Sequence, residues 1–382
     1  MQKKQFKLVY ITPSLHIAGG VERVLTLKAN YLADQEGYDV TVVLTDGAGR
    51  PFFYPLSERV RVVQLDIGFE ELWSRSFWRK IPLYLKKQRL YRRRLTACLN
   101  ELQPDVTISL LRREINFLCD IKDGSKKVGE LHVNRANYRN FEATDTSAVK
   151  RLFAWWWMRA LVRQLWRLDR FVVLTHEDAQ AWPELHNIEV IPDPLPFLPQ
   201  KQSPLTARRV IAVGRYAYQK GFDLLLRAWR QVQDDSVDWR LDIYGAGDRG
   251  PYEQLRQQLG IDPSRCGLNG ATSAIHDEYL ASSLLAFSSR FEGFGMVLAE
   301  AMSCGLPVVA FACPCGPKDI VTHETDGLLV EPGNVEALAN SLRRLMTDGD
   351  LRTRMGAMAR EKARNFDLAA LGARWTKLFE TL

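Results

Sequence analysis

Short apolar runs alternate with amphipathic stretches along this chain. Residues Phe6 to Thr12 form an apolar run rich in β-branched and aromatic side chains, and Pro13 ends it. This composition predicts a buried strand. A loop with Gly19-Gly20, a helical stretch from Val21 to Glu36 and a second apolar run from Asp39 to Thr45 follow. The order strand, glycine loop, helix, strand predicts a parallel α/β unit with a right-handed crossover.

The same alternation continues and then restarts after a proline cluster. Further strands of the first half are expected at 60–65, 106–110, 127–130, 170–174 and 188–191. The segment Pro192-Asp193-Pro194-Leu195-Pro196, continued by Pro199 and Pro204, cannot lie inside a helix or a central strand. The second half has expected strands at 209–213, 239–244, 284–288 and 307–311, and expected helices at 222–232, 252–259, 275–281, 296–303 and from 335 onward. We therefore predict two parallel α/β domains joined by a proline-rich linker, with a ligand cleft between the carboxyl ends of their sheets.

Composition narrows the class of protein. The 382 residues are too many for one ordinary core, and 46% hydrophobic with 25% charged residues is typical of a soluble globular protein. The net charge of +7 favours anionic partners such as nucleotide phosphates or acidic lipid headgroups. The six cysteines are scattered, which indicates neither a disulfide framework nor a zinc site. No apolar run is long enough for a signal peptide or a membrane span, so we expect a cytoplasmic protein.

Two cations follow the first strand of the second half. Gly214, Arg215 and Lys220 lie in the loop between that strand and the next helix, at the carboxyl edge of the sheet. An Arg fork and a Lys point charge can together hold a diphosphate, and Gly214 lets the backbone approach a ligand. A solvated loop with ordinary surface charges is the alternative.

Two glutamates flank the start of a later helix. Gly293 and Gly295 keep Glu292 in the loop, and the helix is expected to begin near Met296. The N–H groups and dipole at a helix N-terminus attract phosphate. Glu300, about one turn into the helix, can accept hydrogen bonds from ribose hydroxyls. The alternative is an acid favoured by the helix dipole together with an unrelated surface acid.

The first half offers a glycine loop and a histidine. The backbone of Gly19-Gly20 can approach phosphates, and a plain βα turn is the alternative. His132 follows the strand that ends near Glu130. There an imidazole can donate a hydrogen bond to a sugar hydroxyl or to a negative charge that develops in a transition state. The alternative is a histidine with a purely structural role.

The segment from Gly245 to Gly250 fits the pattern G-x-G-x-x-G of dinucleotide sites. It is not the first strand-to-helix turn of its domain, and Pro251 follows it directly. A simple turn into a helix is therefore the favoured interpretation.

Basic and aromatic side chains gather on expected helices of the first half. They are Trp73, Trp78, Arg92-Arg93-Arg94, Arg151, Trp155-Trp156-Trp157, Arg159, Arg163 and Arg167. Such helices can dock on an anionic membrane surface, and the alternative is a core-facing aromatic stripe with a solvated basic face. No nucleic-acid module is present in the sequence, so a nucleic-acid partner is not expected.

Three segments together resemble retaining glycosyltransferase family 4, and the likeness covers nearly the whole chain. They run from Ala18 to Arg23, from Val213 to Phe222 and from Ser289 to Met302, and Gly305-Leu306-Pro307-Val308 follows the last. The third contains the family's motif of Glu, seven residues, Glu. The resemblance implies the GT-B fold, in which two Rossmann-like parallel α/β domains face each other across a cleft. It further implies an acceptor-binding domain at 1–195, a nucleotide-sugar-binding domain at 205–365 and a last helix, 366–382, that crosses back to the first domain.

The resemblance also implies roles for individual residues. Arg215 and Lys220 would bind the donor diphosphate and stabilise the leaving group, and Glu300 would hold the ribose. Gly19 and Gly20 would face the phosphates from the first domain, and Gly214 would let the second domain approach them.

The donor sugar would be bound by Glu292 and by the backbone around Phe294 and Gly295, next to the helix start at Met296 and Val297. His132 would lie near the sugar and the acceptor. The segment Glu130-Leu131-His132-Val133-Asn134 has one residue more than the Glu-His-Asn spelling that is common in the family.

The function implied is retaining transfer of a sugar from a UDP- or GDP-sugar to a saccharide or lipid-linked saccharide. The sequence resembles those of bacterial enzymes that build capsule, exopolysaccharide or lipopolysaccharide at the inner face of the membrane. The resemblance implies no metal or other cofactor. No Asp-x-Asp motif is identified that would hold a metal ion, and cations with a helix N-terminus would take its place. Two other hypotheses stay open: a nicotinamide-dependent oxidoreductase that uses the Gly245 loop, and a non-catalytic membrane-associated scaffold.

Overall fold

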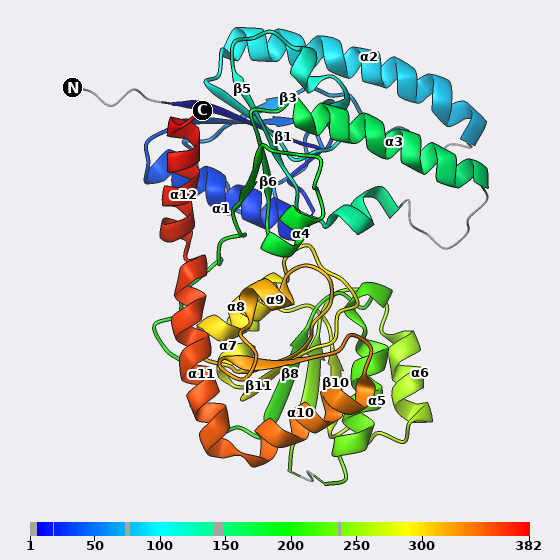
Figure 1. Cartoon of the computed structure of the whole chain (residues 1–382), viewed down its shortest axis with the longest axis vertical. Helices are drawn as coiled ribbons and strands as arrows, with labels where there is room; N and C mark the ends of the chain where they lie inside the picture. The colour runs from blue at the N-terminus through cyan, green and yellow to red at the C-terminus, as the bar shows by residue number, and fades with distance from the viewer. Residues whose placement is uncertain (1–5, 18, 73–76, 141–147, 236–237) are drawn as a thin grey trace. The chain divides into compact units, whose positions relative to one another are not determined.

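The computed structural model describes residues 6–17, 19–72, 77–140, 148–235 and 238–382. Ala18 and Trp73, which the sequence analysis singled out, lie outside these ranges. The chain divides into two compact units, each built on its own parallel sheet (Figure 1). Unit 1 comprises Met1–Leu174, Asp178–Pro196 and Leu368–Leu382, and unit 2 comprises Thr175–Glu177 and Phe197–Asp367.

The sheet of unit 1 has seven strands in the order β3-β2-β1-β4-β5-β6-β7. The strands are β1 (Lys7–Thr12), β2 (Asp39–Leu44), β3 (Arg61–Gln64), β4 (Val106–Ser109), β5 (Lys126–Glu130), β6 (Arg170–Val173) and β7 (Ile188–Val190). All neighbouring strands are parallel. The strand order reverses between β1 and β4, and ligands of such sheets bind beside the reversal, at the carboxyl ends of the strands.

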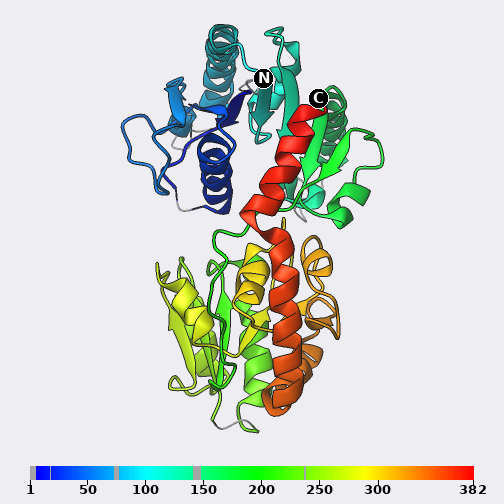
Figure 2. The same cartoon turned by 90° about the vertical axis from the view of Figure 1, so that its left-hand side faces the viewer.

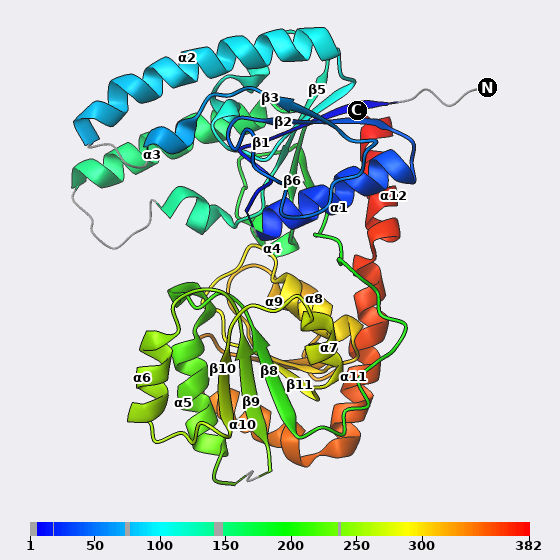
Figure 3. The same ribbon diagram turned by 180° about the vertical axis from the view of Figure 1, so that it is seen from behind.

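Helices cover both faces of this sheet. On one face, α1 (Gly20–Asp34) and α12 (Leu368–Glu380) bury Leu25 and Trp375 against Tyr10. The two helices pack against each other, as Figures 2 and 3 show. On the other face, α2 (Phe77–Leu102) and α3 (Ala148–Trp166) pack on the alternate strand residues, which include Val9 and Val173. Unit 1 therefore has three layers, because successive side chains of a strand point to opposite faces.

Unit 2 has a six-stranded parallel sheet in the order β10-β9-β8-β11-β12-β13. The strands are β8 (Arg209–Val213), β9 (Arg240–Tyr244), β10 (Cys266–Asn269), β11 (Leu284–Phe287), β12 (Val308–Phe311) and β13 (Gly327–Val330). The helices are α5 (Phe222–Val232), α6 (Gly250–Gln258), α7 (Ile275–Leu280), α8 (Met296–Ser303), α9 (Pro317–Ile320), α10 (Val335–Thr347) and α11 (Gly349–Ala363). Helix α5 packs on α6 and α10, and α8 packs on α11 (Figure 3).

Short elements complete the chain. They are α4 (His176–Gln180) and the 3-10 helices η1 (Phe69–Leu72), η2 (Glu114–Asn116), η3 (Leu118–Asp120), η4 (Arg135–Asn140), η5 (Tyr218–Lys220) and η6 (Arg364–Phe366). The helices expected at 222–232 and 296–303 have those bounds as α5 and α8. No strand was predicted at β10 or β13, which are the two edge strands of their sheet.

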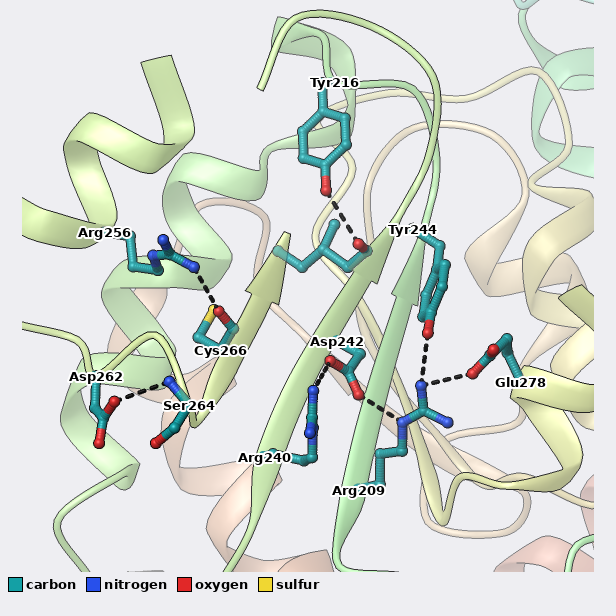
Figure 4. A network of polar contacts seen from close by, with 11 residues as sticks. Arg209, Tyr216, Arg240, Asp242, Tyr244, Arg256, Asp262, Ser264, Cys266 and Glu278 are labelled. Atoms are coloured by element: carbon teal, nitrogen blue, oxygen red, sulfur yellow. Dashed lines mark hydrogen bonds and ion pairs between the residues drawn. The ribbon is translucent and has the colours of Figure 1, made fainter. Parts of the chain in front are cut away.

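A buried carboxylate stabilises the sheet of unit 2 (Figure 4). Asp242 on β9 is 1% exposed and accepts hydrogen bonds from Arg209 Nε and from an Arg240 guanidinium nitrogen, both at 2.6 Å. Arg209 also donates to the Tyr244 hydroxyl at 2.8 Å and to Glu278 of α7 at 2.6 Å. Two guanidinium groups thus compensate a carboxylate whose burial would otherwise be costly, and Arg209 also links α7 to the sheet.

Candidate functional site

The loop at 214–221 leads from β8 into α5 and carries two of the predicted cations. Its last residue, Gly221, has φ 61° in the left-handed region. A Cβ atom at Gly221 would overlap the carbonyl oxygen of Ser288, which directly follows β11. Glycine therefore lets this loop pack against the end of the neighbouring strand.

Lys220 and Glu292 form the centre of the predicted site in unit 2. Glu292 is 6% exposed, and Lys220 Nζ donates to its Oε1 at 2.6 Å. Ser289 Oγ donates to the same oxygen at 2.6 Å, and Gln219 Nε2 lies 3.4 Å from Oε2. These donors come from the loops after β8 and β11, so Glu292 joins the two loops and its carboxylate has a fixed orientation.

The N-terminus of α8 lies beside this carboxylate. Gly295 is the N-cap residue with φ 92°, and a Cβ atom there would lie 3.8 Å from Cγ of Glu292. As a glycine, Gly295 has no side chain with which to cap the helix. The N–H group of Leu298 donates to the carbonyl of Gly295, so the N–H groups of the half-buried Met296 and Val297 are the ones that an anion would bind.

The glycine loop before α8 is supported from within unit 2. Phe294 is buried, and its ring packs nearly perpendicular to that of Phe366, with 5.6 Å between the centroids. Gly316, with φ 115°, lets another loop approach so closely that a Cβ atom would overlap the carbonyl oxygen of Phe294. The conformation at Phe294 and Gly295 is thus fixed by packing on both sides.

Glu300 lies inside α8 and is 4% exposed, so the alternative of a surface acid is wrong. The hydroxyl of Tyr279 on α7 donates to its Oε2 at 3.1 Å. A buried carboxylate held by one phenol can accept further donors, such as the hydroxyls of a ribose.

The remaining residues of the loop after β8 have different surroundings. A Cβ atom at Gly214 would lie 3.0 Å from the aliphatic carbons of Lys220, so the lysine stem lies across this glycine. Arg215 is exposed, and within the described parts of the chain it forms no hydrogen bond or ion pair. The structure therefore brings Gly214, Lys220, Glu292 and the start of α8 together and leaves the Arg215 guanidinium available to a ligand.

Close packing explains the G-x-G-x-x-G segment. A Cβ atom at Gly245 would overlap the carbonyl oxygen of Gly214, and Gly247 has φ 117° against the backbone of Tyr216. Gly250 begins α6, with Pro251 in its first turn. The glycines are needed where β9 ends against the loop after β8, which supports the interpretation as a turn into a helix.

The glycine pair of unit 1 begins α1. Gly19 is its N-cap residue and Gly20 its first residue, followed by Glu22 in the first turn. A Cβ atom at Gly20 would meet no described atom within 4 Å. Gly20 therefore leaves open space for a ligand at this helix start.

His132 lies in a buried group of charges in unit 1. Its side chain is 5% exposed, with Nε2 3.2 Å from Glu130 and Nδ1 3.3 Å from Asp193. Lys28 of α1 forms a very short ion pair with Glu130. Sequence reasoning missed these partners, although Lys28 stands between Leu25 and Leu32 on the buried side of α1, where a lysine is unexpected.

The charges of this group shift one another's pKa. Burial lowers the pKa of His132, but the carboxylates of Asp193 and Glu130 outweigh burial and raise it to about 9. Burial raises the pKa of Glu130, but Lys28 and His132 outweigh it and lower it to about 2. One atom from each of Glu130, His132 and Asp193 lies within 4.8 Å of the others, a spacing that could suit a metal ion. The ammonium of Lys28 would repel a cation there, so the group fits a proton better than a divalent ion.

His132 also lines a pocket of ≈ 250 Å³ in unit 1. Most of the lining is apolar, and Arg112, Asn137 and Tyr138 add polar groups. The pocket lies at the carboxyl ends of β4 and β5, where ligands of parallel sheets bind.

The six cysteines are all buried and none forms a disulfide, in agreement with a packing role. Burial raises the pKa of Cys98 to about 11, and the carboxylate of Glu101 adds to this effect. Such a thiol is uncharged near neutral pH and a poor nucleophile or metal ligand.

Comparison with known sequences gives a consistent result. Residues 197–362 match the family model described as "Glycosyl transferases group 1". An "Uncharacterized glycosyltransferase" of Haemophilus influenzae is 28% identical over 381 residues, which are 97% of this chain and 98% of the relative. The "Lipopolysaccharide core biosynthesis glycosyltransferase LpsD" of Rhizobium meliloti is 27% identical over 292 residues, covering 75% of this chain and 78% of the relative.

Comparison with solved structures concerns the fold. A variant of S. aureus TarM in complex with Fondaparinux, alpha-GlcNAc-glycerol and UDP has a TM-score of 0.76 to this chain at 16% sequence identity. The match covers 98% of this chain and 100% of TarM. It therefore extends over both units.

Proposed function

This chain is a glycosyltransferase with the GT-B fold, and we propose that it is a retaining, metal-independent enzyme of family 4. The donor is a UDP- or GDP-sugar. The acceptor is a saccharide or lipid-linked saccharide of a cell-surface polysaccharide such as lipopolysaccharide or capsule. The similarity to LpsD of Rhizobium meliloti and to a UDP-bound TarM supports this substrate class.

The observation that carries the proposal is the contact of Lys220 with the buried Glu292 beside the open N-terminus of α8. A donor diphosphate would bind between the Lys220 ammonium, the Arg215 guanidinium and the first N–H groups of α8. Glu292, with its orientation fixed, would accept hydroxyls of the donor sugar, and Glu300 would accept those of the ribose. Both acids already bind a protein donor, Lys220 and Tyr279, which favours hydroxyl recognition over metal binding.

The reaction breaks the bond between the anomeric carbon and the diphosphate oxygen and forms a bond to the acceptor oxygen on the same face. Negative charge grows on the leaving diphosphate, and Lys220, Arg215 and the N–H groups of α8 are placed to stabilise it. The acceptor proton passes to an oxygen of the leaving phosphate. The nucleoside diphosphate thus departs with the proton, and no side-chain base is required.

Nucleotide binding tests the proposal directly. In a screen of UDP, GDP and ADP, either UDP or GDP is expected to raise the melting temperature most, and EDTA should leave the increase unchanged. At a nucleotide concentration 100 times the Kd the stabilisation is about 2.7 kcal/mol, or roughly 5–10 °C for a domain of this size. NAD serves as the control and should have no effect. The proposal would be contradicted if stabilisation required a divalent metal, or if NAD alone stabilised the protein. NMR of the product, which shows the anomeric configuration of the transferred sugar, tests whether transfer is retaining.

A separate surface supports peripheral binding to an anionic membrane, which we propose as the location of the enzyme. Trp155 and Trp156 of α3 are 57% and 61% exposed, and the Arg159 guanidinium lies 5.3 Å from the Trp155 ring centroid. Helix α2, on the same face of the sheet, exposes Ile81 and Leu85. The exposed cations nearby in sequence are Lys86, Arg89, Arg92, Arg93, Arg94, Arg159, Arg163 and Arg167.

Exposed tryptophans beside cations suit the headgroup region of an anionic bilayer. The alternative of a purely core-facing aromatic stripe is wrong for Trp155 and Trp156. The side chains of Trp78 and Arg151 lie outside the described residues. In the part of the chain that the structure describes, no helix combines the length and the apolarity that a membrane crossing requires.

Vesicle co-sedimentation tests this location. The protein is expected to sediment with phosphatidylglycerol vesicles, to stay in solution with phosphatidylcholine vesicles, and to be released by salt. Replacing Arg159 and Arg163 by Gln should weaken binding roughly 30-fold, since each cation contributes about 1 kcal/mol. Met358→Ala, an exposed residue of unit 2, is the control. Equal binding to both lipids, or no effect of the arginine substitutions, would refute the membrane surface.

A further inference from the structure

The buried charges around His132, including His132 itself, come from three separate segments of unit 1. Lys28 belongs to α1, Glu130 ends β5, His132 follows that strand and Asp193 lies in the proline-rich segment after β7. Lys28 is 3% exposed, and its ammonium lies 4.1 Å from the ring centroid of Trp375 on α12. Chain segments so distant in sequence meet here although burying charges is costly, which indicates a specific arrangement.

We propose that Glu130 and Asp193 hold His132 as a fixed imidazolium in the wall of the unit 1 pocket, and that Lys28 is the positioning residue that fixes Glu130. The proposal rests on the proposed function, because it takes the pocket beside His132 as part of the acceptor site. It adds Lys28, Glu130 and Asp193 to the residues on which sugar transfer depends.

Charge balance supports the imidazolium. The group contains two carboxylates, Glu130 and Asp193, and one permanent cation, Lys28. With a neutral His132 its net charge is −1, and with a protonated His132 it is 0. An uncompensated buried charge costs several kcal/mol, so the protonated state is favoured. Each ring nitrogen lies within ion-pair distance of a carboxylate, at 3.2 and 3.3 Å, so a positive charge on the ring is attracted from both sides.

The contacts of His132 are ion pairs rather than well-aligned hydrogen bonds. Among the described residues, neither ring nitrogen has a hydrogen-bond partner with good geometry. One other polar group faces the cluster. The buried phenol of Tyr10 on β1 stays neutral because burial, and then Glu130, raise its pKa well above its usual value. Arg112 lines the same pocket as His132 but is exposed, so solvent screens its charge and it does not enter the balance of the buried group.

The consequence for catalysis is that His132 cannot act as a base. An imidazolium has no lone pair with which to take the proton of an acceptor hydroxyl. Its contribution is a fixed positive charge at the pocket wall, which favours the developing negative charge of the reaction. This agrees with transfer of the acceptor proton to a phosphate oxygen.

Titration of His132 by NMR tests the proposal without any activity measurement. The imidazole signals of 15N-labelled protein are assigned with a His132→Gln variant. The pKa of His132 is expected to be above 8, against about 6.5 for a free histidine. It should fall by more than one unit in Asp193→Asn and in Glu130→Gln. Asp169→Asn, at a partly exposed ion pair with Lys126 in unit 1, should leave it unchanged.

A pKa of His132 near or below 6.5 in the unaltered protein would overturn the proposal, and so would a high pKa that neither acid affects. The first result needs no variant, so it holds even if a substitution prevents folding. Nucleotide binding in the melting experiment is independent of this titration. Failure of the imidazolium and failure of the proposed function are therefore distinguishable.

The pH profile tests whether the charge matters for the reaction. The melting screen identifies the nucleoside diphosphate of the donor. The rate at which this nucleoside diphosphate is released from its sugar donor should fall only above about pH 8, where His132 begins to deprotonate. In Asp193→Asn the pH at which the rate begins to fall on the alkaline side should be lower by at least one pH unit. A uniform loss of rate with this pH unchanged would show that Asp193 is merely structural.

Discussion

Replacing Lys220 by Met is expected to lower kcat/KM for sugar transfer about 10²–10³-fold. Removing one preorganised group that stabilises transition-state charge typically raises the barrier by about 2.7–4 kcal/mol. Lys220 is the cation fixed by Glu292 and by the turn at Gly221, so its charge requires little reorganisation during the reaction. Methionine keeps most of the aliphatic stem that lies across Gly214. Steady-state release of the nucleoside diphosphate from the selected donor measures the effect.

Loss of the Lys220 charge also leaves Glu292 without its cation, so stability must be separated from catalysis. The double variant Lys220→Met/Glu292→Gln removes both charges and should melt at a higher temperature than Lys220→Met, while its kcat/KM stays at least as low. Lys362→Met, which removes an ion pair with Asp326 on another part of unit 2, is the matched control and should keep its rate. Comparable rates for Lys220→Met and this control would refute the diphosphate role of Lys220.

The sequence was most informative where a local signal decides the backbone. Glycines before α5 and α8 have positive φ, and both helices begin directly after them, as the patterns at 222–232 and 296–303 predicted. The contacts of Glu292 with Lys220 followed from topology, because loops at the carboxyl ends of adjacent parallel strands meet. The strands β10 and β13 escaped notice because each is a short edge strand containing glycine, which weakens a strand pattern.

The group around His132 could not be predicted in the same way. Asp193 was assigned to a proline-rich linker. The prolines indicate where a helix cannot form, but they do not indicate which groups the Asp193 carboxylate contacts. Lys28 stood on the buried side of a helix, yet its partner Glu130 lies at the end of a strand far away in sequence. Periodicity reveals that a charge is buried, but only the three-dimensional fold shows which opposite charge compensates it.

The largest effect on stability is expected from Lys28→Met. Breaking a buried ion pair by removing one partner costs about 3–5 kcal/mol, because the other charge stays buried without compensation. The Lys28–Glu130 pair meets this condition, with side chains 4% and 1% exposed. For a domain of this size the melting temperature of unit 1 should fall by roughly 6–20 °C. Differential scanning calorimetry measures the change.

A matched lysine and a double variant decide whether this cost arises from the unpaired charge. Lys126 pairs with Asp169 at 3.3 Å with side chains 48% and 33% exposed, so Lys126→Met should cost about 1 kcal/mol or less. Adding Glu130→Gln to Lys28→Met removes the stranded carboxylate and should recover part of the lost stability. If the two substitutions were additive, the contact of Lys28 with Trp375 would account for the loss instead of the ion pair. Recovery in the double variant would show that Lys28 acts through Glu130, the same link by which it positions His132.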